Sequence, residues 1–243
     1  MNLVVDIGNT SVKMAVFQNN SLLDKRIFSL SDFFKNFQKI KDQFPEIKDC
    51  MLSSVVNTIS EEKKMLQQST DLIELTPALS LPFKNKYASP STLGKDRIAL
   101  VAAAVAKFPH KNTLVIDAGT CVTFDFKNKK EEYLGGAISP GLEMRFKALH
   151  KFTANLPLLK PGDNLQLIGT STAGSINSGV VNGLLLEIEG TMASYATEYK
   201  DLTIILTGGD TQFLSMRLKN SIFANSNFLL EGLNHILEFN KTQ

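Results

Sequence analysis

Two stretches decide the fold of this chain: MNLVVDIGNTSVKMAVFQ at residues 1–18 and TLVIDAGTCVTFDF at residues 113–126. In each stretch an apolar strand ends in Asp-x-Gly, a short polar turn with a threonine follows, and alternating apolar residues return as a second strand. Self-similarity of this kind predicts a duplicated unit.

The turn after the first strand has two interpretations, which the residues leave open. Gly8 and Asn9 suit the tight turn of an ordinary β-hairpin. The same turn suits a phosphate loop, because glycine lets backbone N–H groups approach an anion, hydroxyls add donors and an acid holds a metal ion. A third glycine turn, residues 207–210, follows the apolar strand 204–206, and we expect it to hold the nucleoside end of a nucleotide.

Strands and helices alternate along both halves of the chain, which predicts an α/β fold. The periodicity predicts strands over 2–7, 11–18, 22–29, 49–56, 71–75 and 201–206, and helices over 32–44, 60–68, 97–108, 142–150, 172–199 and 231–239. The two halves begin alike, so we expect two lobes with a cleft between them. Gly179 and Gly183, four residues apart, predict close packing of the long helix.

Composition narrows the class of protein. The chain has 243 residues, 43% of them hydrophobic, with 26 basic and 24 acidic residues in no block of one sign. This argues against a nucleic-acid or polybasic membrane surface, and no apolar run has the length of a membrane span. The spacing of two cysteines and three histidines indicates neither a disulfide framework nor a zinc site. The N-terminal residues lack the pattern of a signal peptide, so we expect a cytoplasmic protein.

Five motifs in order resemble those of the type III pantothenate kinases. They are DIGNT (6–10), YASPSTLGKDR (87–97), DAGTCVTFD (117–125), GGAISPGLEMR (135–145) with TANLP (153–157), and GTSTAGSINSGVVNG (169–183). Cys121 and Val122 stand where an Ala-Ile pair is more usual. The resemblance implies the duplicated ribonuclease H-like fold of actin-like ATPases, with a central nucleotide cleft. We place the lobes at 1–110 and 111–243.

The resemblance also implies the activity, which is ATP-dependent phosphorylation of pantothenate to 4′-phosphopantothenate, the first step toward coenzyme A. The positions that match the ATP-binding residues of the family are Asp6, Ile7, Gly8, Asn9, Thr10, Ser11, Val12, Lys13 and Thr120. Asp6 is also suited to hold magnesium through water. Asp117 matches the residue that binds a monovalent cation, potassium or ammonium.

The catalytic base that the resemblance implies is Asp96. The matching pantothenate-binding residues are Tyr87, Gly94, Lys95, Asp96, Arg97 and Thr172. Members of the family are homodimers that bind pantothenate near the dimer interface.

Structural roles compete with several of these assignments. Asp96 is also placed to cap the Ala-rich helix, Thr172 to cap the long helix, Tyr87 to pack against its loop, and Lys13 to be a solvated strand residue. Two other functions compete as well. One is a non-catalytic nucleotide-binding regulator or assembly protein of the same superfamily, which needs no base at position 96. The other is a phosphatase or a different small kinase.

Overall fold

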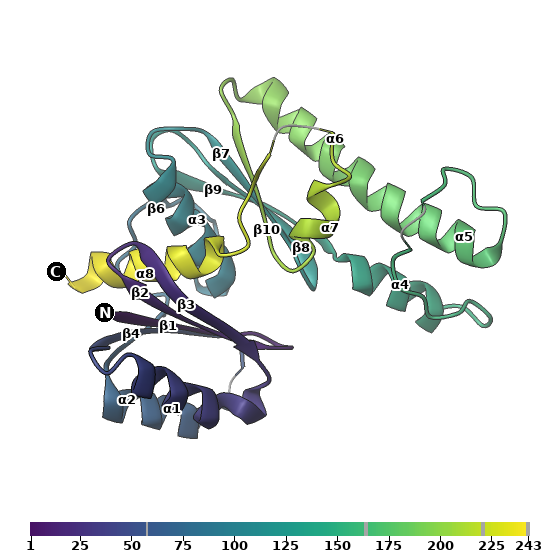
Figure 1. Ribbon diagram of the computed structural model, residues 1–243. Helices are drawn as coiled ribbons and strands as arrows, with labels where there is room; N and C mark the ends of the chain where they lie inside the picture. The colour runs from purple at the N-terminus through teal and green to yellow at the C-terminus, as the bar shows by residue number, and fades with distance from the viewer. Residues whose placement is uncertain (57, 163–164, 220–221, 242–243) are drawn as a thin grey trace. The chain divides into compact units, whose positions relative to one another are not determined.

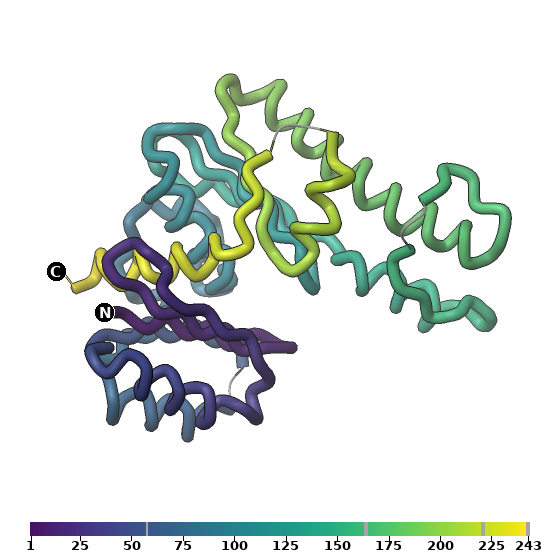
Figure 2. The backbone as a smooth tube through the Cα atoms, viewed as in Figure 1, coloured from purple at the N-terminus to yellow at the C-terminus, as the bar shows by residue number. Residues whose placement is uncertain are grey.

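The computed structural model describes residues 1–56, 58–162, 165–219 and 222–241, drawn in Figures 1 and 2. The chain forms two compact units. The first unit comprises Met1–Lys107 together with Asn227–Gln243, and the second comprises Phe108–Ser226. None of the helices in the described part of the chain is both long and apolar enough to cross a membrane.

The first unit is built on a five-stranded sheet in the order β3-β2-β1-β4-β5. The pairs β1–β2 and β2–β3 are antiparallel, whereas β4 pairs in parallel with β1 and β5 in parallel with β4. The strands are β1 (Asn2–Ile7), β2 (Val12–Gln18), β3 (Ser21–Phe28), β4 (Asp49–Ser54) and β5 (Asp71–Glu74).

Helices cover both faces of this sheet. They are α1 (Phe33–Gln43), α2 (Ser60–Ser69), α3 (Lys95–Lys107) and α8 (Phe228–Lys241). Side chains alternate along a strand, so β1 sends Leu3, Val5 and Ile7 into the core that includes α1 and α2. The opposite face includes Asn2, whose amide donates to Asn234 of α8 at 2.7 Å. Between β5 and α3 the chain forms only a short strand, β6 (Lys84–Asn85), and a 3-10 turn at Pro90–Thr92.

The second unit repeats the topology of the first. Its strands lie in the order β11-β10-β7-β8-β9, with β7, β8 and β9 antiparallel and with β10 and β11 added in parallel. The strands are β7 (Thr113–Ala118), β8 (Cys121–Lys127), β9 (Glu132–Pro140), β10 (Thr203–Thr207) and β11 (Phe223–Ala224). The helices are α4 (Leu142–Lys151), α5 (Thr172–Asn177), α6 (Gly183–Glu198) and α7 (Thr211–Ser215). The predicted duplicated α/β fold is therefore confirmed.

The division between the units lies at 107/108, three residues before the predicted boundary at 110/111, and the last helix, α8, belongs to the first unit instead of the second. Figure 2 shows this helix returning to the N-terminal strands. Contact with α3 explains the return. A Cβ atom on Gly232 of α8 would lie 1.8 Å from the carbonyl oxygen of Ala99, so only glycine permits this approach. Residues 163–164, 220–221 and 242–243 of the expected second lobe lie outside the described residues.

The long helix expected over 172–199 is interrupted. A π-helical turn at Ser178–Asn182 joins α5 to α6. The predicted packing role of Gly179 and Gly183 is wrong for the described part of the chain, because a Cβ atom added at either position would meet no described atom within 4 Å apart from the backbone of its own helix. These glycines line an open face of the helix.

We predict that Gly232→Ala lowers the free energy of unfolding by about 1–3 kcal/mol, because the added methyl group forces α8 away from α3. Urea unfolding of the purified protein measures this change. Gln67→Ala, at an exposed position of α2, is the control and should change stability by less than about 0.5 kcal/mol. Equal stability of Gly232→Ala and the parent would contradict the close approach.

Candidate active site

Asp6, the penultimate residue of β1, is a buried carboxylate with only 7% of the residue exposed. In the parallel register with β4 its partner is Ser53, whose side chain hydrogen-bonds to it. The ammonium nitrogen of Lys13 lies 3.6 Å from a carboxylate oxygen of Asp6. Burial raises the pKa of Asp6, and the negative charge of Asp96 raises it further, whereas Lys13 and Ser53 oppose the rise. The ionised form of Asp6 is therefore disfavoured by its burial, and a bound cation would stabilise it.

The turn after Asp6 is a β-hairpin, as the first interpretation predicted. The N–H of Gly8 donates to the carbonyl of Ser11 at 3.0 Å, and Ile7 pairs with Val12 across the two strands. Ile7 and Val12 are both buried, so only their backbones are available to a ligand. The exposed turn residues between them, Asn9 and Thr10, leave donors open to solvent. A hairpin of this kind is compatible with a phosphate loop.

Asp96 is the second residue of α3, and its carboxylate accepts a hydrogen bond from the N–H of Arg97 at 2.8 Å. A Cβ atom on Gly94 would lie 2.3 Å from the same carboxylate oxygen, so the missing side chain at Gly94 makes room for it. Arg97 is buried, and its guanidinium lies 5.5 Å from the centre of the Tyr87 ring. The structure therefore brings four predicted residues together at the start of α3.

Two further residues of this site were missed by sequence analysis. Ser53, the penultimate residue of β4, lies beside Asp6. Glu74 ends β5, and the ammonium nitrogen of Lys95 in α3 lies 3.6 Å from its carboxylate. The carboxyl ends of neighbouring parallel strands meet at one edge of a sheet, so β1, β4 and β5 deliver Asp6, Ser53 and Glu74 to the same edge. The available signal was a polar residue near the end of each predicted apolar strand, Ser53 in 49–56 and Glu74 in 71–75.

In the second unit the equivalent turn follows β7. The N–H of Gly119 donates to the carbonyl of Cys121 at 2.9 Å, and Thr120 at its tip is exposed. Gly141, at the start of α4, fits against this turn, since a Cβ atom there would lie 2.2 Å from the Gly119 carbonyl oxygen and 2.4 Å from that of Thr120. The glycine of the SPG motif therefore holds α4 close to the turn.

The third glycine turn lies beside the second. Gly208 follows β10 with φ of +99°, and a Cβ atom there would lie 2.2 Å from the carbonyl oxygen of Ala118 and 2.3 Å from a carboxylate oxygen of Asp117. Asp210 donates its N–H to Ala118 at 3.0 Å, and burial followed by the charge of Glu143 raises the pKa of its carboxyl group. Oxygen atoms of Asp117 and Ala118 thus converge beside Gly208.

Thr172 is exposed as the first residue of α5, in the second unit. Its predicted structural role as the helix cap is wrong, because the cap is Ser171, whose hydroxyl accepts the N–H of Gly174 at 3.1 Å. The side chain of Thr172 is therefore left available for another role.

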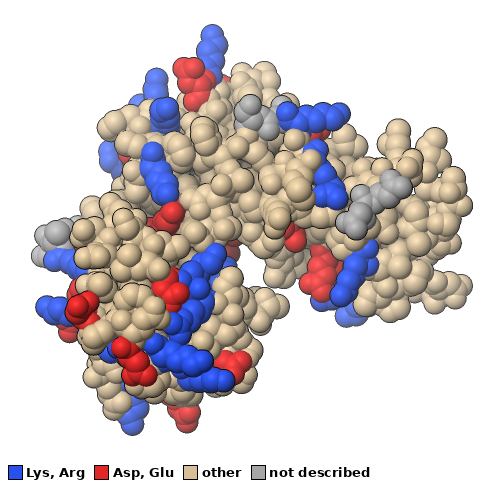
Figure 3. Space-filling model, viewed as in Figure 1, with Lys and Arg blue, Asp and Glu red and all other residues tan. Residues whose placement is uncertain are grey.

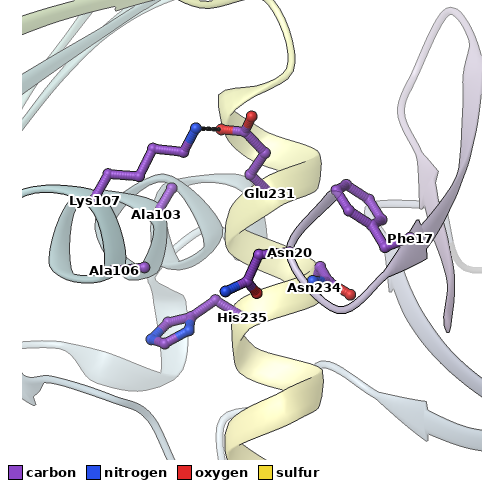
Figure 4. A pocket seen from close by; sticks show the side chains of 8 residues that line it. All are labelled: Phe17, Asn20, Ala103, Ala106, Lys107, Glu231, Asn234 and His235. Atoms are coloured by element: carbon purple, nitrogen blue, oxygen red, sulfur yellow. Dashed lines mark ion pairs between the residues drawn. The ribbon is translucent and has the colours of Figure 1, made fainter. Parts of the chain in front are cut away.

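A cavity of about 100 Å³ in the first unit contains none of the predicted site residues (Figure 4). It lies between α3, α8 and the β2–β3 hairpin, at the opposite end of α3 from Asp96. An ion pair of 2.7 Å between Lys107 and Glu231 crosses its wall. On the face of the molecule drawn in Figure 3, acidic and basic side chains are interspersed.

Metal binding by the predicted residues is chemically reasonable, although no three His, Cys, Asp or Glu residues in the described ranges gather as a metal cluster. Magnesium is commonly held by one or two carboxylates together with substrate phosphates, which suits the buried, strained Asp6. Carboxylate and backbone carbonyl oxygens suit potassium, and Asp117 and Ala118 supply both beside Gly208.

The repeated topology, with a glycine turn after the first strand of each unit, defines the class of actin-like ATPases and sugar kinases. Solved structures agree on this fold. A Campylobacter jejuni protein described as a Baf family transcriptional activator is 23% identical, with a TM-score of 0.65, over 99% of this chain and 100% of that one. A glucokinase from an Antarctic psychrotroph is 13% identical, with a TM-score of 0.51, over 98% of both chains.

Sequence comparison narrows the class. A model of the type III pantothenate kinase family matches residues 2–194. A type III pantothenate kinase of Christiangramia forsetii is 62% identical over the full length of both chains, and one of Flavobacterium johnsoniae is 46% identical over 98% of each. The chain belongs to the type III pantothenate kinase family, whose members phosphorylate pantothenate in the biosynthesis of coenzyme A.

We predict that Asp6→Asn makes the ligand-free protein more stable near pH 7. Burial raises the pKa of Asp6, so the folded state binds a proton more tightly than the unfolded state, and stability falls as pH rises through the range between the two pKa values. The amide carries no buried charge and still accepts a hydrogen bond from Ser53. Thermal unfolding at several pH values measures the difference.

The advantage of Asp6→Asn should shrink below about pH 4, where the parent carboxyl group is protonated in both states. ATP titration of the same protein should show weaker binding. A parent more stable than Asp6→Asn at pH 7 would contradict the strained carboxylate.

Proposed function

We propose that this chain transfers the terminal phosphoryl group of ATP to the primary hydroxyl of pantothenate, with Asp96 as the general base. The observation that carries the proposal is the placement of two carboxylates, Asp6 near the end of β1 and Asp96 in the first turn of α3, near enough for the negative charge of Asp96 to raise the pKa of Asp6. Kinases need two such groups, one that binds the metal ion near the phosphates and one that accepts the proton of the attacking hydroxyl.

ATP is proposed to bind through residues 6–13, and Thr120 is proposed as a further ATP-binding residue. The tip of the first hairpin offers backbone N–H groups and hydroxyls, and Lys13 supplies a positive charge that now neutralises Asp6. Magnesium enters with ATP, and Asp6 would hold it through water. The ion would neutralise charge on the transferred group.

Pantothenate is proposed to bind at Tyr87, Gly94, Lys95, Asp96, Arg97 and Thr172. Two cationic side chains, Lys95 and Arg97, lie beside Asp96 at the helix N-terminus, which favours an anionic substrate. An alcohol is a poor nucleophile at neutral pH, so a carboxylate in hydrogen-bond reach assists by accepting its proton as the bond to phosphorus forms.

The chain is further proposed to act as a cytoplasmic homodimer. Gly179, Gly183, Leu186 and Gly190 recur at helical spacing, so they share one face of the helix. Leu186 is 65% exposed on this face, and added Cβ atoms at the three glycines would meet nothing within 4 Å. A small, apolar and unoccupied helix face suits the close approach of the same face in a second copy.

Family membership makes the chain an enzyme and sets aside the alternative of a non-catalytic regulator or assembly protein. The likeness to the Campylobacter jejuni protein does not restore that alternative, because at 23% identity it concerns the fold alone.

We predict that Asp96→Asn lowers kcat for pantothenate phosphorylation by about 10²–10⁴-fold, the usual contribution of a general base. Asparagine keeps the shape of the side chain and its hydrogen bond from Arg97 but does not accept the substrate proton. Steady-state kinetics and an ATP-binding titration measure the two effects separately. A kcat within a few-fold of the parent would show that Asp96 is structural.

We predict that the rate depends on potassium or ammonium and falls in sodium-only buffer. The smaller sodium ion fits a potassium-sized set of oxygen atoms poorly, and Asp117 supplies the charged oxygen of the proposed set. Asp117→Asn should lower the rate and abolish the preference between the two ions. Equal rates of the parent in sodium and potassium buffers would rule out a selective monovalent site.

A further inference from the structure

We propose that Glu74 is a positioning residue for the reaction, which acts through Lys95 to fix the first turn of α3. This inference rests on the proposed role of Asp96 as the base, because that turn carries Asp96. Neither the resemblance to the family nor the sequence pattern assigned Glu74 a role.

Glu74 occupies a fixed place at the edge of the sheet where the site lies. It is the last residue of β5 and pairs with Leu52 of β4, and the next N–H, that of Leu75, donates to the carbonyl of Leu52 at 2.9 Å. The backbone at Glu74 is therefore held by the sheet ladder on both sides of its Cα atom. A side chain on such a backbone is well placed to hold a neighbouring segment, here the start of α3, in position.

Two lysines share the carboxylate of Glu74. The ammonium nitrogen of Lys63 in α2 lies 2.6 Å from one oxygen, and that of Lys95 lies 3.6 Å from the other. The hydrogen bond from Lys63 is the main cause that lowers the pKa of Glu74, and the charge of Lys95 adds to it. The carboxylate thus stays ionised in the working pH range and links β5, α2 and the first residue of α3.

The start of α3 needs such an anchor because little regular structure precedes it. Residues 76–94 contain only β6 and one 3-10 turn, and Gly94 has no side chain to restrain the backbone just before the helix. The ion pair of Lys95 with Glu74 ties this turn to β5, and the guanidinium of Arg97 lies against the ring of Tyr87 in the preceding loop.

Glu74 also holds the ammonium group of Lys95 in its observed position. All three side chains of the network are partly exposed, at 41% for Lys63, 28% for Glu74 and 27% for Lys95, and ion pairs of this kind contribute little to stability. Without Glu74 the ammonium group of Lys95 is released next to Asp96, where it competes for the carboxylate that must accept a proton. The expected consequence is therefore a loss of rate rather than a loss of fold.

The test compares Glu74→Gln, Lys95→Met and the double variant in the full-length protein, with kcat, KM for both substrates and thermal stability measured for each. Glu74→Gln should lower kcat by about 10- to 100-fold, as a misplaced catalytic group does, and leave KM for ATP unchanged. Because Glu74 acts through Lys95, the double variant should have the kcat of Lys95→Met alone. Glu74→Asp, which keeps the charge, should recover part of the rate.

Glu231→Gln is the matched control, since it removes the ion pair to Lys107 at the opposite end of the same helix. It should leave kcat within about twofold of the parent, as expected for a surface change away from the site. A parent-like kcat in Glu74→Gln, a further loss of kcat in the double variant beyond Lys95→Met, or an equal loss in Glu231→Gln would each overturn the inference.

The outcome for Asp96→Asn separates this inference from the proposed function. If Asp96→Asn is inactive while Glu74→Gln is fully active, Asp96 keeps its role and only Glu74 loses its own. If Asp96→Asn is as active as the parent, the proposed base is wrong, and the inference that depends on it is overturned too.

Discussion

The first unit is organised around a carboxylate that is buried at the end of a buried strand. Asp6 is out of water, and burial raises its pKa. An isolated charge in such a place is unfavourable, so the surrounding structure supplies compensation, with Lys13 from the returning strand and Ser53 from the parallel strand beside it. Both partners depend on the register of β1 with β2 and β4. A shift of one residue would turn Asp6 toward the apolar core formed with α1 and α2.

Duplication supplies the second unit with the same sheet order but a different set of groups at its edge. Asp117 has the position of Asp6, but its strand partners are Thr207 and Thr123 where Asp6 has Ser53 and Lys13. Gly208 of a second glycine turn also lies against Asp117 and the carbonyl group of Ala118. Gly141 and Gly208 allow these segments to approach, because each would place a Cβ atom within 2.4 Å of a backbone oxygen. The same topology is therefore compatible with both proposed roles, magnesium and phosphate binding at Asp6 and monovalent-cation binding at Asp117.

Local pattern predicted the strands β1 to β5, β7, β8 and β10, the hairpin turns and the duplication, because alternation and Asp-x-Gly turns are encoded within a few residues. It did not predict β6, β9 or β11. Ser53 and Glu74 were missed because their roles come from parallel pairing between β1, β4 and β5, which no local pattern reveals. The assignment of α8 to the first unit depends on Gly232 meeting Ala99 more than a hundred residues away. The cap of α5 was misplaced by one residue, since Ser171 and Thr172 are equally good candidates in sequence.

The proposed function is phosphorylation of pantothenate at the sheet edge that carries Asp6, beside Asp96 at the start of α3. Its most direct test is mass detection of 4′-phosphopantothenate after incubation of the purified protein with ATP, magnesium, potassium and pantothenate, with glucose and acetate offered in parallel. The account predicts phosphopantothenate formed in step with ADP, and no phosphorylated glucose or acetate. A folded protein that binds ATP but yields no phosphopantothenate, or that phosphorylates a sugar instead, would contradict it.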